Sequence, residues 1–221
     1  MQKIWFTSDT HFGHGNIIKY CARPFFSANE QKIYEATQHP EASEEDKAEY
    51  KKMALSPESL DRHDEQLIAN WNTCVSKGDR VYHLGDFSFG NEDYIEKILA
   101  RLNGDIHLIK GNHDRNLRAL EKRCIWVKDY FELKVKDNGQ NQKIILLHYA
   151  LRVWNASHYG SWHLYGHSHA TLADDPLALS IDVGIDAVAL WHANDENICK
   201  RYRPISFDEV KEILNKKGNL R

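Results

Sequence analysis

The chain has 221 residues and a net charge of −3, with 42% hydrophobic and 11% aromatic residues. This length and composition fit one domain with a sizeable core, so we expect residues 1–221 to form a single domain. The acidic balance gives no support to a general nucleic-acid-binding role, although it leaves room for a local basic patch.

Cysteine usage and the N-terminal residues indicate the class of protein. The four cysteines are far apart and form no C-x-x-C pair, which argues against a zinc knuckle or a thioredoxin-like motif and is typical of reduced thiols. Residues 1–6 lack a charged segment followed by an apolar one, so we expect no signal peptide. No apolar run approaches the length of a membrane span. We therefore expect a cytoplasmic protein with no membrane contact.

The first predicted element is a β-strand over residues 4–7, an apolar run that ends at Ser8. Asp9 and His11 follow it, two positions apart. In an extended segment, residues i and i+2 point to the same side, so both side chains could reach one metal ion. His14 and Asn16 come next, on a loop expected to overlook the site. For both residues, a substrate contact and an ordinary loop hydrogen bond remain open.

The next segment contains a candidate phosphate contact and a helical insertion. Arg23 could place its guanidinium over a substrate phosphate, whose oxygens suit its fork, and an exposed salt bridge is the alternative. Residues 27–59 are rich in Glu, Lys, Ala and Gln and are too short for a core of their own. Within them, Ser43 is predicted to begin an exposed helix through Tyr50 and Met53. We expect this insertion to cover part of the cleft and to select substrates.

The middle of the chain alternates helices with strands. Apolar stripes predict helices over residues 61–75 and 92–102, and short apolar runs predict strands over 80–84 and 105–109. Such alternation is typical of βαβ units and a largely parallel first sheet. The motif Gly85-Asp86 follows one of these strands, and Gly111-Asn112-His113-Asp114 follows the other. The Asp86 carboxylate has two oxygens, which makes it the natural ligand to share between two cations.

The last part of the chain begins with a predicted hairpin. Asn138-Gly139 separates the runs 131–135 and 143–147, and this pair tolerates the positive φ of a tight turn. The second half is therefore expected to be more antiparallel. His148 follows the hairpin directly, and Gly166-His167-Ser168-His169 follows a predicted strand over 162–165. A capping-box pattern from Ser206 to Glu209 predicts the start of a final helix.

Together the five polar motifs predict a metal site. Each motif alone has a structural explanation, such as a turn or a buried, hydrogen-bonded histidine. Their shared position after five predicted strands outweighs that explanation, because the C-terminal ends of parallel strands open on one edge, where α/β folds bind ligands. The mixture of imidazole, carboxylate and amide oxygen suits Mn²⁺, Fe or Zn²⁺, whereas an all-oxygen set would indicate Mg²⁺ or Ca²⁺. We find neither a nucleophile elbow nor a phosphate-binding glycine-rich loop.

The series D-x-H, G-D, G-N-H-D, H and G-H-x-H, in this order, resembles the calcineurin-like metallophosphoesterase superfamily. The match runs from Asp9 to His169, and its flanking sequence, including Val183-Gly184-Ile185-Asp186, is similar to small bacterial and phage members. The resemblance implies an α/β fold with two packed mixed β-sheets flanked by helices in a four-layer sandwich. Many bacterial members point to Mn²⁺ as the metal.

The resemblance also implies a role for each motif residue. One ion would be bound by Asp9, His11, Asp86 and His169, and the other by Asp86, Asn112, His148 and His167. His113 would bind no metal but would serve the leaving group. Asp114 would orient the ring of His113 by accepting from its far nitrogen.

We therefore expect a phosphoesterase that hydrolyses mono- or diesters of small molecules or nucleotides, with no protein partner implied. Two cations about 3.5–4 Å apart would hold a bridging hydroxide for in-line attack, with His113 protonating the leaving oxygen. A nuclease acting on DNA or RNA is the first alternative, and a salt-sensitive DNA affinity would favour it. A non-catalytic scaffold is the second, and the intact Asn112-His113-Asp114 motif argues against it.

Overall fold

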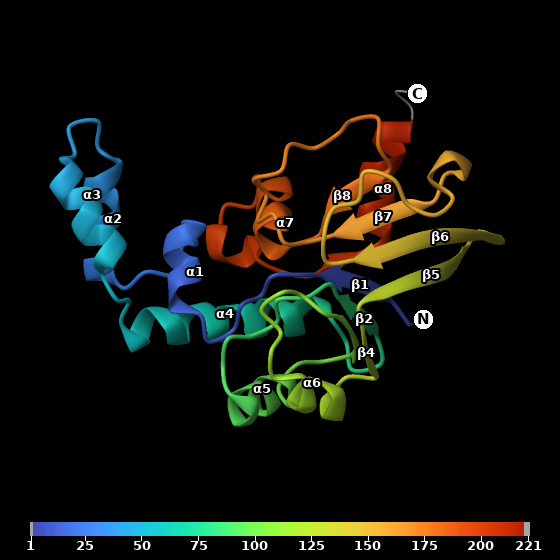
Figure 1. Cartoon of the computed structure of the whole chain (residues 1–221), viewed down its shortest axis with the longest axis horizontal. Helices are drawn as coiled ribbons and strands as arrows, with labels where there is room; N and C mark the ends of the chain where they lie inside the picture. The colour runs from blue at the N-terminus through green and yellow to red at the C-terminus, as the bar shows by residue number, and fades with distance from the viewer. Residues whose placement is uncertain (1, 219–221) are drawn as a thin grey trace.

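The structure is a computed structural model that describes residues 2–218. Two β-sheets pack face to face at its centre and helices flank them (Figure 1). This is the α/β arrangement of two mixed sheets that the family resemblance implied. No helix within residues 2–218 is long and apolar enough to cross a membrane.

The first sheet confirms the predicted βαβ organisation. Its five strands have the order β4-β3-β2-β1-β9: β1 (Ile4–Thr7), β2 (Arg80–His83), β3 (Asp105–Ile109), β4 (Trp126–Lys128) and β9 (Ile205–Ser206). β1 to β4 are parallel, and only β9 runs antiparallel to its neighbour. The crossovers contain α4 (Pro57–Cys74), α5 (Glu92–Leu99) and α6 (Leu117–Arg123).

The second sheet is less antiparallel than predicted. It contains β5 (Tyr130–Asp137), β6 (Gln140–Leu147), β7 (Trp162–Tyr165) and β8 (Ser180–Asp182) in that order. The hairpin of β5 and β6 is confirmed, with φ values of 48° at Asn138 and 85° at Gly139. β6, β7 and β8 are parallel, however, because each crossover segment returns the chain to the end of the sheet where the preceding strand began. One crossover contains the short 3-10 helix η1 (Ser157–Tyr159).

The chain ends with helices that close the sandwich. α7 (Ile185–Trp191) and the 3-10 helix η2 (Ile198–Arg201) follow β8, and α8 (Phe207–Gly218) is the last described element. The predicted capping box at its start is confirmed, since the Ser206 backbone N–H donates to Glu209 at 2.8 Å and the Glu209 N–H donates to the Ser206 hydroxyl at 3.2 Å. The ring of Phe207 stacks on Trp162 of β7 with centroids 5.5 Å apart.

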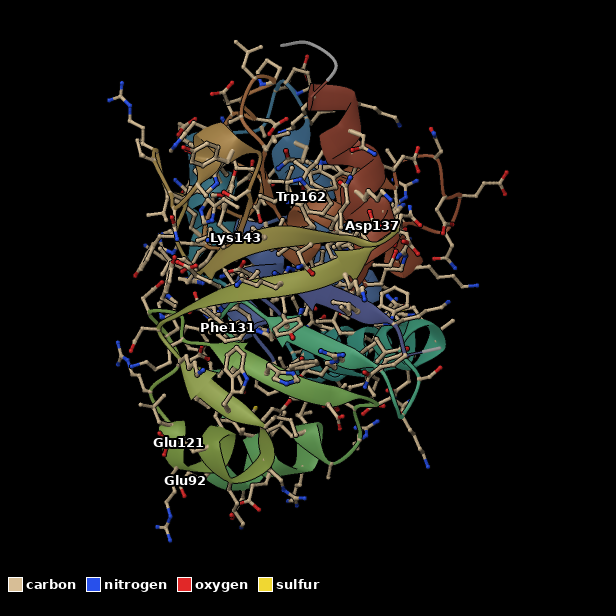
Figure 2. The ribbon with its side chains drawn as sticks, turned by 90° about the vertical axis from the view of Figure 1, so that its right-hand side faces the viewer. Glu92, Glu121, Phe131, Asp137, Lys143 and Trp162 are labelled. Atoms are coloured by element: carbon tan, nitrogen blue, oxygen red, sulfur yellow. The ribbon has the colours of Figure 1, made fainter. Side chains whose placement is uncertain are left out.

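Alternation along the strands divides the core into two layers. Trp5 packs on the helix side of the first sheet, whereas its neighbour Phe6 packs between the sheets, as the two-residue period of a strand requires. Figure 2 shows Phe131 of β5 on the side that faces the first sheet, where its ring centroid lies 6.4 Å from that of Tyr82. The two sheets therefore share an aromatic and aliphatic interior.

The predicted insertion forms two helices that extend from the body. α1 (Gly15–Tyr20) is followed by α2 (Ala28–Gln38) and α3 (Glu44–Lys52), and we call the last two the α2–α3 arm. α3 begins after Ser43 as predicted, where the Ser43 side chain accepts from the Asp46 N–H at 3.0 Å. In Figure 1 the arm lies beyond α1 and points away from the sheets. Its predicted role in selecting substrates stays a prediction.

Candidate metal centre

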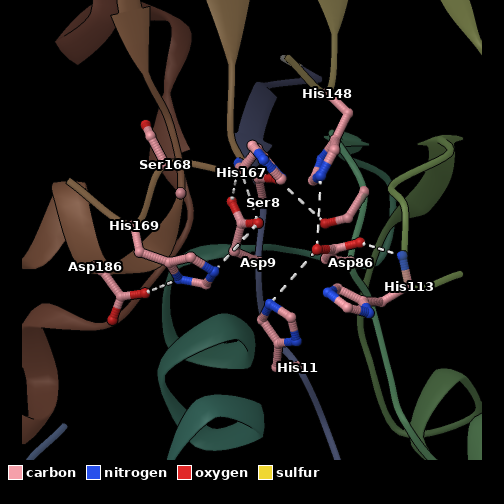
Figure 3. A network of polar contacts seen from close by, with 12 residues as sticks. Ser8, Asp9, His11, Asp86, His113, His148, His167, Ser168, His169 and Asp186 are labelled. Atoms are coloured by element: carbon pink, nitrogen blue, oxygen red, sulfur yellow. Dashed lines mark hydrogen bonds and ion pairs between the residues drawn. The ribbon is translucent and has the colours of Figure 1, made fainter. Parts of the chain in front are cut away.

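The five predicted ligand motifs follow five parallel strands. The strands β6 and β7 of the second sheet end directly before their motifs, and β1, β2 and β3 of the first sheet end one residue before theirs. Because the sheets pack face to face, these ends meet at one edge of the sandwich. Figure 3 shows the side chains that point into the shared space: Asp9, His11, Asp86, His148, His167 and His169.

The ligand atoms form two clusters, within each of which they lie within 4.8 Å of one another. The members are Asp9, His11 and His169 in one cluster, and Asp86, His148 and His167 in the other. The amide oxygen of Asn112 lies 3.0 Å from Nε2 of His148, and so adjoins the second cluster. Six of the seven predicted ligands thus fall into two clusters and Asn112 adjoins the second, although Asp86, implied for both ions, belongs to the second cluster alone. Their role as metal ligands stays a prediction.

Asp86 belongs to the second cluster and also faces the first. Its Oδ2 is 3.6 Å from Nε2 of His11 and 3.5 Å from Nε2 of His148, while Oδ1 accepts from the backbone N–H of His113 at 2.8 Å. Burial disfavours the carboxylate anion, but the His148 hydrogen bond and the neighbouring donors lower the pKa of Asp86 to about 2. A buried carboxylate thus stays charged at the point where two cations would need a common ligand.

At five of the seven predicted ligand positions the backbone is left-handed rather than extended. The φ angles are 57° at Asp9, 50° at His11, 56° at Asp86, 68° at His167 and 45° at His169. The expectation that Asp9 and His11 share one side of an extended segment is therefore wrong, although both side chains reach the same cluster. Non-glycine residues adopt this conformation rarely, and such strain concentrates at functional sites.

Two glycines leave room for the predicted carboxylate ligands. A Cβ atom at Gly111 would collide with Oδ1 of Asp86, and one at Gly166 would collide with the Asp9 carboxylate and the Ser8 hydroxyl. The backbone of one motif therefore touches the carboxylate of another. An alanine at either position would displace a carboxylate from the centre.

The electrostatics of Asp9 and His11 fit a cation. Both ring nitrogens of His11 are buried and have no hydrogen-bond partner within residues 2–218. Burial, reinforced by the charge of Arg23, lowers the pKa of His11 to about 2, so its imidazole is neutral. Burial raises the pKa of Asp9 to about 7, against the attraction of His169. Buried imidazole nitrogens without a hydrogen bond, and a buried carboxylate that must ionise, both cost free energy. A bound cation would offset that cost.

Two histidines are oriented through their other ring nitrogen. Nδ1 of His148 donates to the backbone oxygen of Leu84 at 2.7 Å, and Nδ1 of His169 donates to Asp186 at 2.7 Å. Each bond leaves Nε2 facing the centre, as is usual for histidines that bind metals. Burial lowers the pKa of His169, but the hydrogen bond and charge of Asp186 raise it to about 10. The Asp186 carboxylate therefore stabilises the protonated form of the His169 ring.

Arg23 lies under the site and does not face a substrate. Its side chain is 0% exposed, which contradicts both the predicted phosphate contact and the alternative of an exposed salt bridge. The guanidinium donates to both carboxylate oxygens of Asp186, to the backbone oxygens of Asp9 and Thr10, and to Nε2 of His63. Protein groups accept hydrogen bonds from all three guanidinium nitrogens, so Arg23 positions other groups.

The prediction that Asp114 orients the ring of His113 is also wrong. One carboxylate oxygen accepts from the N–H groups of Asp86 and Gly111, and the other from the N–H of Phe87, each at 2.8 Å. The carboxylate therefore joins two ligand loops and does not bind the ring of His113. That ring is partly exposed and makes no hydrogen bond within residues 2–218, so it remains available to a substrate.

Phe89, which no sequence motif singles out, is a neighbour of the site. Its ring is 42% exposed, stacks on His14 with centroids 3.8 Å apart and lies 4.7 Å from the ring of His113. Burial lowers the pKa of His14 to about 4, and its Nδ1 has no hydrogen-bond partner within residues 2–218. Asn16 is exposed on the first turn of α1, where its predicted contact with the substrate stays untested.

Sequence reasoning also missed the polar network behind the centre. From Asp186 it passes through Arg23 to His63, whose Nδ1 donates to Asp64 at 2.7 Å. The other oxygen of Asp64 accepts from the Tyr94 hydroxyl and from a backbone N–H. The motif that ends at Asp186 belongs to the sequence that resembles the family, but the arginine that pairs with Asp186 lies 163 positions away. No local sequence pattern predicts a contact between residues so far apart in the chain.

Comparison with known proteins agrees with this geometry. A sequence model of the family described as calcineurin-like phosphoesterase matches residues 2–218. The uncharacterized protein MJ1445 of Methanocaldococcus jannaschii is 29% identical over 226 residues, which cover 98% of this chain and 93% of that protein. The Gene 66 protein of Mycobacterium phage D29 is 26% identical over 242 residues, which cover 97% of each chain.

A solved structure is similar in fold. The protein of unknown function AQ665 from Aquifex aeolicus superposes with a TM-score of 0.56 at 20% identity, over 96% of this chain and all of that one. This likeness supports the two-sheet fold alone. The family model, in contrast, spans the described chain and includes all five ligand motifs. The chain therefore belongs to the calcineurin-like phosphoesterase family.

Proposed function

We propose that this protein is a metal-dependent phosphoesterase that hydrolyses phosphate mono- or diesters at a dinuclear centre. The observation that carries the proposal is the place of Asp86 Oδ2, almost equidistant from His11 of one cluster and His148 of the other. The residues that would hold one ion are Asp9, His11, Asp86 and His169, and those for the other are Asp86, Asn112, His148 and His167. When bound, the two ions would supply an activated hydroxide and a clamp for phosphoryl oxygens.

The chemistry of the predicted ligand atoms limits which metal ions suit the site. Imidazole nitrogens outnumber carboxylates, and one amide oxygen completes the set, which suits Mn²⁺, Fe or Zn²⁺ better than Mg²⁺ or Ca²⁺. Among these metals, we propose Mn²⁺ as the ion that the protein binds. The positive φ angles and the glycine contacts described above support the same proposal, because they hold the donors in a fixed arrangement before any ligand binds.

The chain's own groups have separate tasks in this reaction. His113 is partly exposed beside Asp86, so its imidazolium is placed to give a proton to the leaving oxygen. The ring of Phe89 forms part of the wall of the site beside His113. A cavity of about 460 Å³ adjoins His167 and is lined by Tyr149 and Leu172, which gives the organic part of an ester room to bind.

Two alternatives differ in measurable ways. A nuclease would bind DNA or RNA with an affinity that falls steeply with salt concentration. A scaffold without catalysis would bind metal but cleave nothing. The intact Asn112 and His113 argue against the scaffold, because a protein without catalysis needs neither the proposed metal ligand nor the proposed proton donor.

The test is turnover by protein stripped with a chelator and reloaded separately with Mn²⁺, Zn²⁺, Mg²⁺ or Ni²⁺. The substrates are p-nitrophenyl phosphate and bis-p-nitrophenyl phosphate, and the variants are Asp86→Asn and His113→Ala. We expect metal-dependent cleavage that Asp86→Asn abolishes and that His113→Ala reduces. Stoichiometric metal binding without cleavage of either ester would count against catalysis and in favour of the scaffold.

A further inference from the structure

The cavity of about 460 Å³ beside His167 shares a wall with the metal centre. Tyr149, which lines it, belongs to the loop after β6, and Thr171 and Leu172 belong to the loop after β7. His167 is part of the same lining and is a predicted ligand in the cluster of Asp86 and His148. A group that is joined by one ester oxygen to a phosphorus atom at the centre can therefore enter the cavity directly.

The lining of this cavity suits an uncharged group rather than a second phosphate. None of the described residues that line it is a lysine, arginine, aspartate or glutamate. The Ser168 hydroxyl donates to Asp182 at 2.7 Å, and the Thr171 hydroxyl donates to the backbone oxygen of Ser168 at 2.6 Å. Because these protons are already donated, neither hydroxyl has one left for an oxygen of an anion. The surface that remains for a ligand is mainly apolar.

Tyr149 and Leu172 supply that apolar surface. Tyr149 is 44% exposed and Leu172 is 51% exposed. The Tyr149 ring meets the rings of His148 and His167 at steep angles of 73° and 65°, with centroids 5.0 and 4.7 Å apart. Edge contacts of this kind hold the orientation of a ring and leave part of its surface free. An exposed tyrosine held in this way can stack on a flat ring, such as a nucleobase.

The proposed proton donor for the leaving oxygen lies in a different direction. The ring of His113 is 4.7 Å from that of Phe89 and 5.7 Å from that of His11. Figure 3 shows His113 and His167 on different sides of the Asp86 carboxylate. A leaving group directed towards His113 therefore points away from the cavity.

The geometry of phosphoryl transfer gives this separation a meaning. In an in-line displacement the leaving oxygen lies opposite the attacking one, whereas the other three oxygens lie in the plane between them. In a diester, one of those three oxygens carries the group that stays on phosphorus, so the two organic groups point in different directions. A monoester has no second organic group and would leave the cavity empty.

We propose that the cavity beside His167 holds the organic group that stays on phosphorus, so that the preferred substrate is a phosphodiester whose retained group carries a flat, uncharged ring. The inference rests on the proposed phosphoesterase function. Tyr149 and Leu172 are then the residues that determine specificity for the retained group. Water and the diester give an alcohol and a monoester, and the ester bond inside the cavity does not break.

The first experiment compares two diesters with the same leaving group on metal-loaded enzyme: thymidine 5′-(p-nitrophenyl phosphate) and methyl p-nitrophenyl phosphate. The ratio of their kcat/KM values reports the retained group alone. We expect the thymidine ester to be preferred about tenfold or more, as stacking on an aromatic ring predicts. Tyr149→Ala should bring the ratio close to one at unchanged metal content. Leu172→Ala, which keeps the contacts of Tyr149 with the two histidine rings, should lower it as well.

The control variant and a third ester separate the possible occupants of the cavity. Tyr159→Ala removes a tyrosine that is 83% exposed and does not line the cavity, so it should keep the ratio. p-Nitrophenyl phosphate is a monoester with the same leaving group. If the cavity held the leaving group, Tyr149→Ala would lower kcat/KM for all three esters by one factor. That result, or equal kcat/KM for the two diesters in the wild type, would overturn the proposal.

The second experiment detects the ring without catalysis, by saturation-transfer NMR of thymidine with chelator-treated protein. We expect transfer to the base protons that Tyr149→Ala abolishes and Tyr159→Ala keeps. Absent transfer in the wild type, or transfer that survives Tyr149→Ala, would overturn the cavity as a site for a flat ring. If no ester is cleaved with any metal, the phosphoesterase proposal fails, and this measurement still decides whether the cavity binds such a ring.

Discussion

Arg23 and Asp186 form a buried two-point ion pair, with Nε to Oδ1 at 2.8 Å and Nη2 to Oδ2 at 2.7 Å. Arg23 also donates to the backbone oxygen of Asp9 at 2.8 Å, and Asp186 also accepts from Nδ1 of His169 at 2.7 Å. One arginine thus connects the loop of one predicted ligand to the carboxylate that orients another. Fork geometry suits this task, and a lysine would not reproduce it.

Asp186→Asn should weaken one metal site selectively. The neutral amide orients His169 less firmly, and loss of such a partner typically costs about 10–100-fold in metal affinity. In a titration of Mn²⁺ into metal-free protein, we expect one of two binding steps to weaken while the other is kept. Unchanged affinity at both steps would show that Asp186 does not position His169.

Arg23→Ala should destabilise the fold strongly. It leaves the carboxylate of Asp186 buried without its partner, and breaking a buried pair in this way costs about 3–5 kcal/mol. The control is Arg101→Ala, which removes a pair with Glu65 whose side chains are 45% and 60% exposed and which should cost less than about 1 kcal/mol. Denaturant unfolding measures both, and equal losses would contradict a special role for Arg23.

Features that depend on neighbouring residues could be predicted from the sequence. Each ligand strand is a short apolar run closed by a polar motif, and the predicted bounds of residues 4–7, 105–109 and 162–165 match β1, β3 and β7. The hairpin at Asn138-Gly139 and the helix starts at Ser43 and Ser206 follow from equally local chemistry. Periodicity, turn residues and caps therefore predicted the elements and the order of the candidate ligands.

Features that depend on distant contacts could not be predicted. Arg23 is polar, and only the fold reveals that Asp186, a backbone loop and His63 surround it. Asp114 stands next to His113 in the chain, yet its carboxylate accepts from backbone groups of two other loops. The parallel direction of β6, β7 and β8 depends on crossovers whose path no local pattern specifies.

His113→Ala should lower the catalytic rate in proportion to the demand of the leaving group. General acid catalysis contributes about 10²–10⁴-fold, and most of that applies when the departing oxygen is strongly basic. We expect a large loss of kcat with an alkyl ester and a smaller one with a p-nitrophenyl ester, at unchanged metal content. The exposed His158 gives the control variant, His158→Ala. Equal losses for both esters would exclude proton transfer by His113.

Glu30→Gln should loosen the base of the α2–α3 arm in a pH-dependent way. Glu30 accepts from Ser27 and Ser56 N–H groups and from two hydroxyls. Burial opposes its charge, but these donors lower its pKa from 4.5 to about 2. A lowered pKa in the folded state gives stability that is present above pH 4.5 and lost as the pH falls towards 2.

The measurement is the unfolding free energy of both proteins between pH 3 and pH 7, taken in metal-free buffer. We expect the wild type to exceed Glu30→Gln by a constant amount above about pH 5 and by a shrinking amount below about pH 4.5. A difference independent of pH would show that the lost contact acts through packing rather than charge.

The most direct test of a shared carboxylate at Asp86 is electron paramagnetic resonance of protein loaded with two equivalents of Mn²⁺. Two ions bridged by one carboxylate interact magnetically, so we predict the signal of a coupled pair in the wild type. Asp86→Asn should give the signal of isolated ions. Isolated-ion signals in the wild type at two equivalents, or binding of only one ion, would contradict the dinuclear centre.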